Sequence, residues 1–93
     1  MELKYRKALG KTIRRLRLMA GITQEELGFE AGLERSYVSS VELATKDPSF
    51  TTIQKIAAAL SVPLSELFRV YEEELRSTAK EIPRRRGRPT NPS

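Results

Sequence analysis

The chain of 93 residues contains no cysteine and no histidine. Without cysteine it can form neither a disulfide framework nor a thiolate metal site. Without histidine it lacks the commonest general base and the commonest metal ligand. Asp and Glu are present, but no catalytic pair of carboxylates, glycine-rich phosphate loop or nucleophile–base pair stands out in the sequence. We therefore expect a protein that is not an enzyme and that has no cofactor and no bound metal.

Long apolar runs are absent as well. No stretch approaches the roughly 20 residues that a membrane span requires, and no signal-peptide core follows Met1. The sequence therefore predicts a soluble, cytoplasmic protein with no membrane partner. At 93 residues the chain has room for one domain at most. Because so small a domain buries a modest fraction of its surface, oligomerisation is one source of added stability.

The net charge of +5 is unevenly distributed along the chain. Residues 1–20 carry seven basic and one acidic side chain, and residues 21–75 carry four basic and ten acidic ones. Residues 76–93 carry six basic and one acidic. Basic segments favour phosphate through counterion release, so the two basic ends are expected to face a phosphate-bearing partner and the acidic middle to face away from it.

Apolar periodicity predicts two helices near the start of the chain. Residues 9, 13, 16 and 20 are apolar at helical spacing, which favours a helix from about Leu3 to Ala20. Gly21 then suits a left-handed helix end. Thr23 followed by Glu26 has the spacing of a capping box, so a second helix is expected to start there.

The residues from Thr23 to Glu42 are typical of two short helices joined by a tight turn. Leu27 and Ala31 lie four apart, Gly32 supplies the turn, and a third helix, which Glu34 can cap, runs to about Leu43. Apolar residues 38 and 41 can seal the third helix against the second, leaving its polar side chains free to meet a partner. Such a pair can place its second helix in the major groove of DNA.

Two further helices complete the predicted all-α fold. Ser49 or Thr51 can cap a fourth helix, and Pro63 suits the first turn of a fifth. The apolar stripe of the fifth helix comprises Leu64, Leu67, Phe68, Tyr71 and Leu75. Three glutamates at 72–74 are unfavourable near a helix C-terminus, so the helix is expected to fray beyond Leu75. We therefore place a folded domain at 1–76 and a basic, disordered tail at 77–93.

Two runs of residues, 21–42 and 47–68, resemble the phage-repressor, or Cro/XRE-type, helix-turn-helix family. The motifs that carry the resemblance are Thr-Gln-Glu-Glu-Leu opening a helix, Ala-Gly at the turn, Glu42 closing the next helix, and Ser-Val-Pro-Leu-Ser-Glu-Leu-Phe near the end. The similarity covers about 9–68. It implies a five-helix phage-repressor-like DNA-binding domain. The segment 34–39 and the short length also resemble controller proteins of restriction–modification systems.

The resemblance implies roles for particular residues. Gln24, at the start of the second helix, is expected to bind a DNA phosphate. Arg35 can donate two hydrogen bonds to a guanine edge and is expected to carry most direct readout. Thr45 and Lys46 follow the recognition helix, where the family contacts the backbone, although Ala44 stands where the family often has glycine. The expected contacts of the recognition helix are Arg35, Ser36, Tyr37, Ser39 and Ser40.

Three further assignments concern structure, assembly and the tail. The resemblance implies a structural ion pair between Arg17 and Glu42. The length of the fifth-helix stripe favours a two-fold interface that includes Leu67, Tyr71 and Leu75. Arg86 and Arg88 resemble the core of a minor-groove hook, and the alternative is an arm that binds phosphate without sequence preference.

Together these features predict sequence-specific binding of double-stranded DNA in transcriptional control. The helix from Arg35 to Leu43 is expected to read the major groove, within a homodimer bound to an inverted-repeat operator. Two other functions remain open at this point. The chain could be an antitoxin or other protein-interaction module with its tail as the neutralising segment, or a general nucleic-acid or coactivator-like adaptor.

Overall fold

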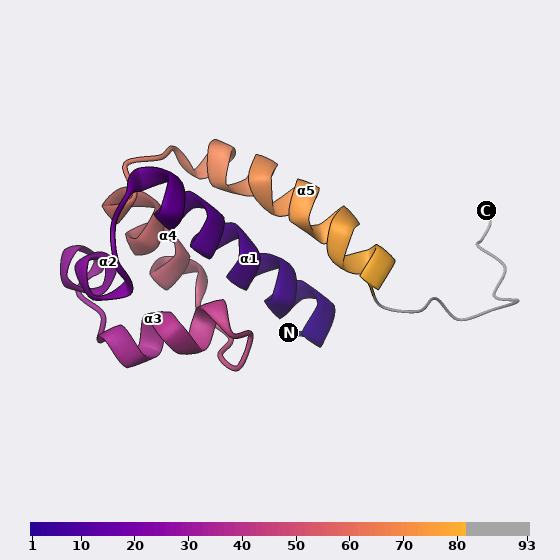
Figure 1. The fold of residues 1–93 in the computed structure, drawn as a ribbon, viewed down its shortest axis with the longest axis horizontal. Helices are drawn as coiled ribbons and strands as arrows, with labels where there is room; N and C mark the ends of the chain where they lie inside the picture. Colours follow the sequence, from indigo (N-terminus) through magenta and orange to yellow (C-terminus); the bar gives the residue numbers. More distant parts are fainter. Residues whose placement is uncertain (82–93) are drawn as a thin grey trace, which may run out of the picture.

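The computed structural model describes residues 1–81 and shows five α-helices and no strand within them (Figure 1). The prediction of an all-α, five-helix fold is confirmed for this part of the chain. Arg86 and Arg88 lie outside the described residues. The helices are α1 (Leu3–Ala20), α2 (Gln24–Ala31), α3 (Arg35–Glu42), α4 (Phe50–Ala59) and α5 (Leu64–Glu81).

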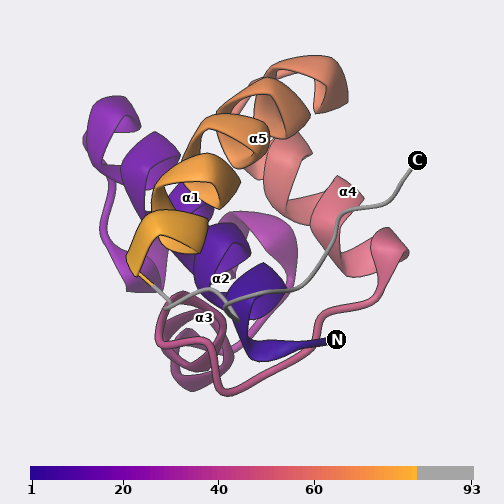
Figure 2. The same ribbon diagram turned by 90° about the vertical axis from the view of Figure 1, so that its right-hand side faces the viewer.

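The two long helices, α1 and α5, lie side by side and run in opposite directions (Figures 1 and 2). On its other side α1 packs against α3, while α2 packs against both α3 and α4. Figure 2 shows the N-terminus beside the loop that joins α3 to α4, where the amino group of Met1 lies 2.6 Å from the carboxylate of Asp47. The core comprises Leu9, Ile13, Leu16, Leu27, Ala31, Val38, Val41, Ile53, Ile56, Ala57, Leu60, Leu67 and Val70.

The ends of α1 and α2 have the predicted chemistry. Gly21 ends α1 with φ of 72°, a left-handed conformation that glycine adopts without steric penalty. The Thr23 hydroxyl accepts a hydrogen bond from the Glu26 amide, and the Glu26 carboxylate accepts one from the Thr23 amide. This reciprocal capping box satisfies two amides that the first turn of α2 would otherwise leave unpaired.

Gly10 lets α1 approach the C-terminal end of α3 closely. A Cβ atom at this position would lie 2.6 Å from the carbonyl oxygens of both Val41 and Glu42. Any side chain here would therefore push the two helices apart. The close contact at Gly10 therefore holds the C-terminal end of α3 against α1.

Helix α5 extends to Glu81, past Leu75, beyond which the sequence predicts fraying, and past residue 76, where it places the end of the folded domain. Two arginines offset the charge of its acidic run. Arg15 on α1 donates to Glu73 and Glu74, and Arg69 pairs with Glu66 and Glu73. Further along α5 the side chain of Thr78 is buried, so the helix still packs there.

Leu67 lies on the core side of α5, together with Val70. Both side chains are fully or almost fully buried within the monomer. Leu67 is therefore covered by its own chain, whereas the predicted two-fold interface would have it meet a second chain. None of the helices in residues 1–81 combines the length and hydrophobicity that a bilayer-spanning segment requires.

Candidate nucleic-acid interface

Helices α2 and α3 form a compact pair joined by a short turn. Leu27 and Ala31 on α2 face Val38 and Val41 on α3, and all four side chains are buried. The turn between the helices uses Gly32 with φ of 72°. Apolar residues at these spacings leave the opposite side of α3 facing outward.

The outward side of α3 carries most of the expected contacts. Arg35 and Ser36 are exposed, while Ser39 and Ser40 are half-buried. Glu34 occupies the N-cap position of α3, but its side chain makes no capping hydrogen bond. The amides at the start of α3 are consequently not blocked by that carboxylate.

Arg17 and Glu42 form a two-pronged ion pair that braces α3 against α1. Arg17 Nε donates to Glu42 Oε2 over 2.6 Å, and Arg17 Nη2 donates to Glu42 Oε1 over 3.0 Å. The two side chains are only 10% and 4% exposed. Arg17 Nη1 also donates to the Ile22 carbonyl oxygen over 3.0 Å. One guanidinium thus joins α1, the turn before α2, and α3.

The opposite charges of Arg17 and Glu42 stabilise one another. Hydrogen bonding to Glu42 raises the pKa of Arg17, against a smaller opposing effect of burial. The Arg17 guanidinium, which proteins do not deprotonate, neutralises the Glu42 carboxylate beside the outward face. A neutralised carboxylate does not repel a phosphate backbone as a free one does.

Gln24 joins the same network. Its Nε2 donates to Glu42 Oε1 over 3.0 Å, and the residue is half-buried rather than free in solvent. Sequence reasoning missed this contact because residues 24 and 42 meet only in the tertiary structure.

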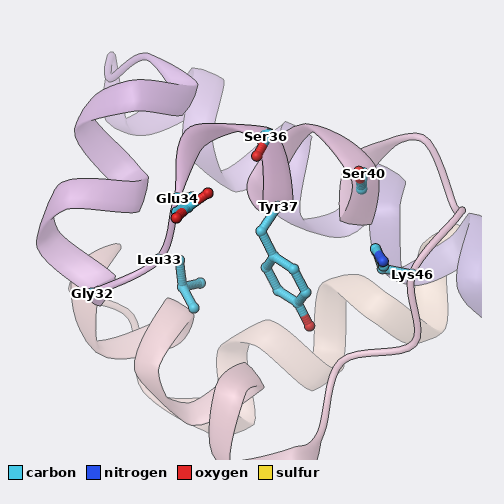
Figure 3. A pocket seen from close by; sticks show the side chains of 7 residues that line it. All are labelled: Gly32, Leu33, Glu34, Ser36, Tyr37, Ser40 and Lys46. Carbon is cyan, nitrogen blue, oxygen red and sulfur yellow. The ribbon is translucent and has the colours of Figure 1, made fainter.

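Two open hollows beside α3 bring together most of the predicted residues of the described chain, although Ser39 and Thr45 line neither of them. The first, of about 420 Å³, lies beside α3, between the turn that precedes this helix and the loop that follows it (Figure 3). This hollow is lined by Ser36, Ser40 and Lys46, and the Tyr37 ring projects into it from α3. Tyr37 is half-buried and packs against the core, so its ring also supports α3.

The second hollow, of about 640 Å³, lies between the end of α1 and the start of α3. Arg17, Gln24 and Arg35 line it, together with the residues that open α2. A helix N-terminus with nearby arginines provides favourable electrostatics for an anion.

The loop after α3 adopts a backbone conformation that usually requires glycine. Ala44 has φ of 66° and is buried. The departure from the family pattern at this position therefore does not redirect the chain, although the left-handed conformation strains a residue with a Cβ atom. Thr45 follows, and both its amide and its hydroxyl donate to the Ser40 carbonyl oxygen, at 2.9 and 3.1 Å. In the structure Thr45 closes the end of α3.

Leu43 is a large apolar side chain that the sequence placed only as the approximate end of the third helix. It caps the C-terminus of α3 and is 70% exposed. The available signal was its spacing, because it lies seven residues after Ser36 and four after Ser39.

The arrangement defines a helix-turn-helix module with a polar, open second helix. Comparison with known proteins agrees: the helix-turn-helix family model matches residues 13–67. The chain therefore belongs to the helix-turn-helix family, as the resemblance predicted.

Restriction–modification controllers are among its relatives. Control protein C.BamHI of Bacillus amyloliquefaciens is 39% identical over 59 residues, which cover 62% of this chain and 73% of that protein. The solved controller protein C.AhdI from Aeromonas hydrophila is 41% identical, with a TM-score of 0.66 over 68% of this chain and 91% of that one. The controller protein C.Esp1396I, solved as a tetramer with its natural 35 base-pair operator, is 25% identical, with a TM-score of 0.74 over 77% of this chain and 95% of that one.

Proposed function

We propose that this protein is a sequence-specific, double-stranded DNA-binding transcriptional regulator that reads the major groove with α3. The observation that carries the proposal is the outward face of α3, on which Arg35 and Ser36 are exposed while Arg17, Gln24 and Glu42 hold the helix in place. A relative of the same fold bound to operator DNA supports it.

Each of the two hollows beside α3 combines residues that read bases with a residue that positions the helix. Arg35 reads a guanine edge, and Ser36, Ser39 and Ser40 make weaker base or sugar contacts. Gln24 and Lys46, one in each hollow, bind phosphates on either side of the groove and set the register of α3. Tyr37 lies against the backbone from its half-buried position. Thr45 contributes mainly by closing the C-terminal end of α3 with its two hydrogen bonds to the Ser40 carbonyl oxygen.

The protein acts as a homodimer on an inverted repeat. An apolar face on α4 and α5 supports this part of the proposal: the exposed rings of Phe50 and Phe68 have centroids 6.4 Å apart. Tyr71 and Leu75 continue along α5 and are half-buried. Beside them lies an apolar hollow of about 360 Å³ that Met1, Phe68 and Tyr71 help to line. A two-fold axis through this face can place two recognition helices about 34 Å apart.

The protein works in the cytoplasm and catalyses no reaction. The absence of cysteine and histidine supports the second statement, since the usual nucleophile–base pairs cannot be assembled. If the same fold served as an antitoxin, its specific partner would be a protein. Selection from a pool of random DNA duplexes would then yield no preferred operator.

Selection of bound sequences from a random duplex pool, followed by variants of Arg35, tests the proposed function. Arg35→Ala should weaken binding to the selected operator by about 1–3 kcal/mol and relax one or two base positions, because the two hydrogen bonds to guanine are lost. Arg35→Lys is the matched control, since it keeps the charge but not the planar fork. It should retain most binding to unrelated duplexes and still lose the guanine preference. An unchanged consensus for folded Arg35→Ala would contradict the proposed readout.

Assembly can be tested with Phe68→Glu, which places a charge in the apolar face. We expect the natural chain to sediment as a dimer and the variant as a monomer that binds half-sites without cooperativity, because a desolvated carboxylate opposes association. Phe29→Glu is the matched control, since Phe29 is 84% exposed on α2 and lies outside this face. A natural chain that stays monomeric at about micromolar concentrations and binds half-sites independently would remove the dimer from the proposal.

A further inference from the structure

Leu43 places a large apolar side chain on the face of α3 that is otherwise polar. It is 70% exposed, and helical spacing sets it on the same side as Ser36 and Ser39. Isolated apolar residues are common on protein surfaces and need no explanation of their own. This one is different because it lies on the surface that the proposed function brings against base edges.

We propose that Leu43 recognises the methyl group of a thymine in the major groove. This inference rests on the proposed DNA-binding function and adds a specificity determinant to it. The edges of base pairs in the major groove offer hydrogen-bond donors and acceptors and a single apolar group, the thymine C5 methyl. A leucine facing those edges can be buried only against that methyl group, and burial there favours A·T pairs at one position.

Backbone hydrogen bonds fix the main chain from which the Leu43 side chain projects. The Leu43 amide donates to the Ser39 carbonyl oxygen over 2.9 Å, and the next two amides donate to Val41 and Ser40. The last turn of α3 is therefore closed on both sides of the leucine. The Gly10 contact to the carbonyls of residues 41 and 42 anchors the same turn against α1.

The length of α3 limits where the thymine can lie. Seven residues of helix separate Leu43 from Ser36, a rise of about 10 Å at 1.5 Å per residue. Since successive base pairs are about 3.4 Å apart, the methyl group recognised by Leu43 lies within about three base pairs of the edge nearest Ser36. Arg35 and Leu43 thus read opposite ends of one short segment.

Replacing single thymines by uracil in the selected operator tests the proposal, because uracil differs only in lacking the methyl group. The natural chain is expected to lose about fourfold in affinity at one thymine of each half-site, the fold-change that corresponds to burying one methylene-sized group. The Leu43→Ala variant should bind the thymine and uracil operators equally at that position. It should also accept other base pairs there in a repeated selection. Leu43→Ile, which keeps an apolar side chain, should restore part of the preference for thymine.

Met19→Ala is the matched control, since Met19 is 73% exposed and apolar but lies on the last turn of α1. It should leave the uracil sensitivity of the natural chain unchanged. Uracil substitution without effect at every thymine, or an equal methyl effect in Leu43→Ala and the natural chain, would overturn the inference. Those results would still leave a selected operator and the Arg35 contact intact, whereas failure to select any operator would overturn the proposed function itself.

Discussion

Replacing Glu42 with alanine is expected to lower the free energy of unfolding by about 2–4 kcal/mol, because Arg17 would be left mostly buried without its partner. Glu42 accepts two hydrogen bonds from Arg17 and one from Gln24. Losing it would therefore loosen α3 from α1 as well as leave a charge uncompensated. Chemical denaturation of the two proteins, followed by helical circular dichroism, measures the difference.

Glu30→Ala is a suitable control for the Glu42 experiment, because Glu30 is exposed on α2. Its removal should change stability by no more than about 0.5 kcal/mol. Glu42→Gln keeps the shape of the side chain and an oxygen acceptor while removing the charge, so it should fall between the other two variants. If Glu42→Ala were as stable as the natural chain, the network would not be what holds α3.

Gly10→Ala is expected to destabilise the fold by about 2–4 kcal/mol, although alanine normally favours a helix over glycine by about 1 kcal/mol. The added methyl group would lie 2.6 Å from two carbonyl oxygens at the end of α3. Backbone atoms cannot swing aside, so α1 and α3 would have to separate. Thermal and chemical unfolding would both report the loss, and DNA affinity should fall with it because α3 would be displaced.

A second glycine separates steric contact from backbone conformation. Gly21 has φ of 72° and would place a Cβ atom in open space, with no atom within 4 Å. Gly21→Ala should therefore lose only the conformational preference, about 1 kcal/mol. A Gly10→Ala variant no less stable than Gly21→Ala would show that the two helices are less closely packed than the structure indicates.

Local signals predicted the beginning of the domain well. The stripe of α1 and the capping box of α2 depend on residues close in sequence, and both were found where spacing placed them. The apolar stripe of α5 was harder to interpret, because residues 64–75 cover more than one face of the helix. Spacing alone does not say that Leu67 faces the core while Phe68 faces solvent.

The remaining differences come from tertiary contacts. The glutamates at 72–74 suggested a frayed end, yet Arg15 from another helix pairs with two of them. The bond from Gln24 to Glu42 links residues 18 apart in the chain, and no periodicity reveals it. Leu43 was recognised only as the approximate end of a helix. Its exposure depends on how the last turn of α3 packs against α1.

The hydrogen bond from Gln24 to Glu42 has a consequence for the entropy of binding. The amide group of Gln24 carries two hydrogens, and the bond to Glu42 uses one of them. In the proposed phosphate contact, the other hydrogen would bond a phosphate oxygen while the side chain keeps its rotamer. Immobilising a flexible side chain at an interface costs about 0.5–1.5 kcal/mol, and here most of that ordering is complete before DNA arrives.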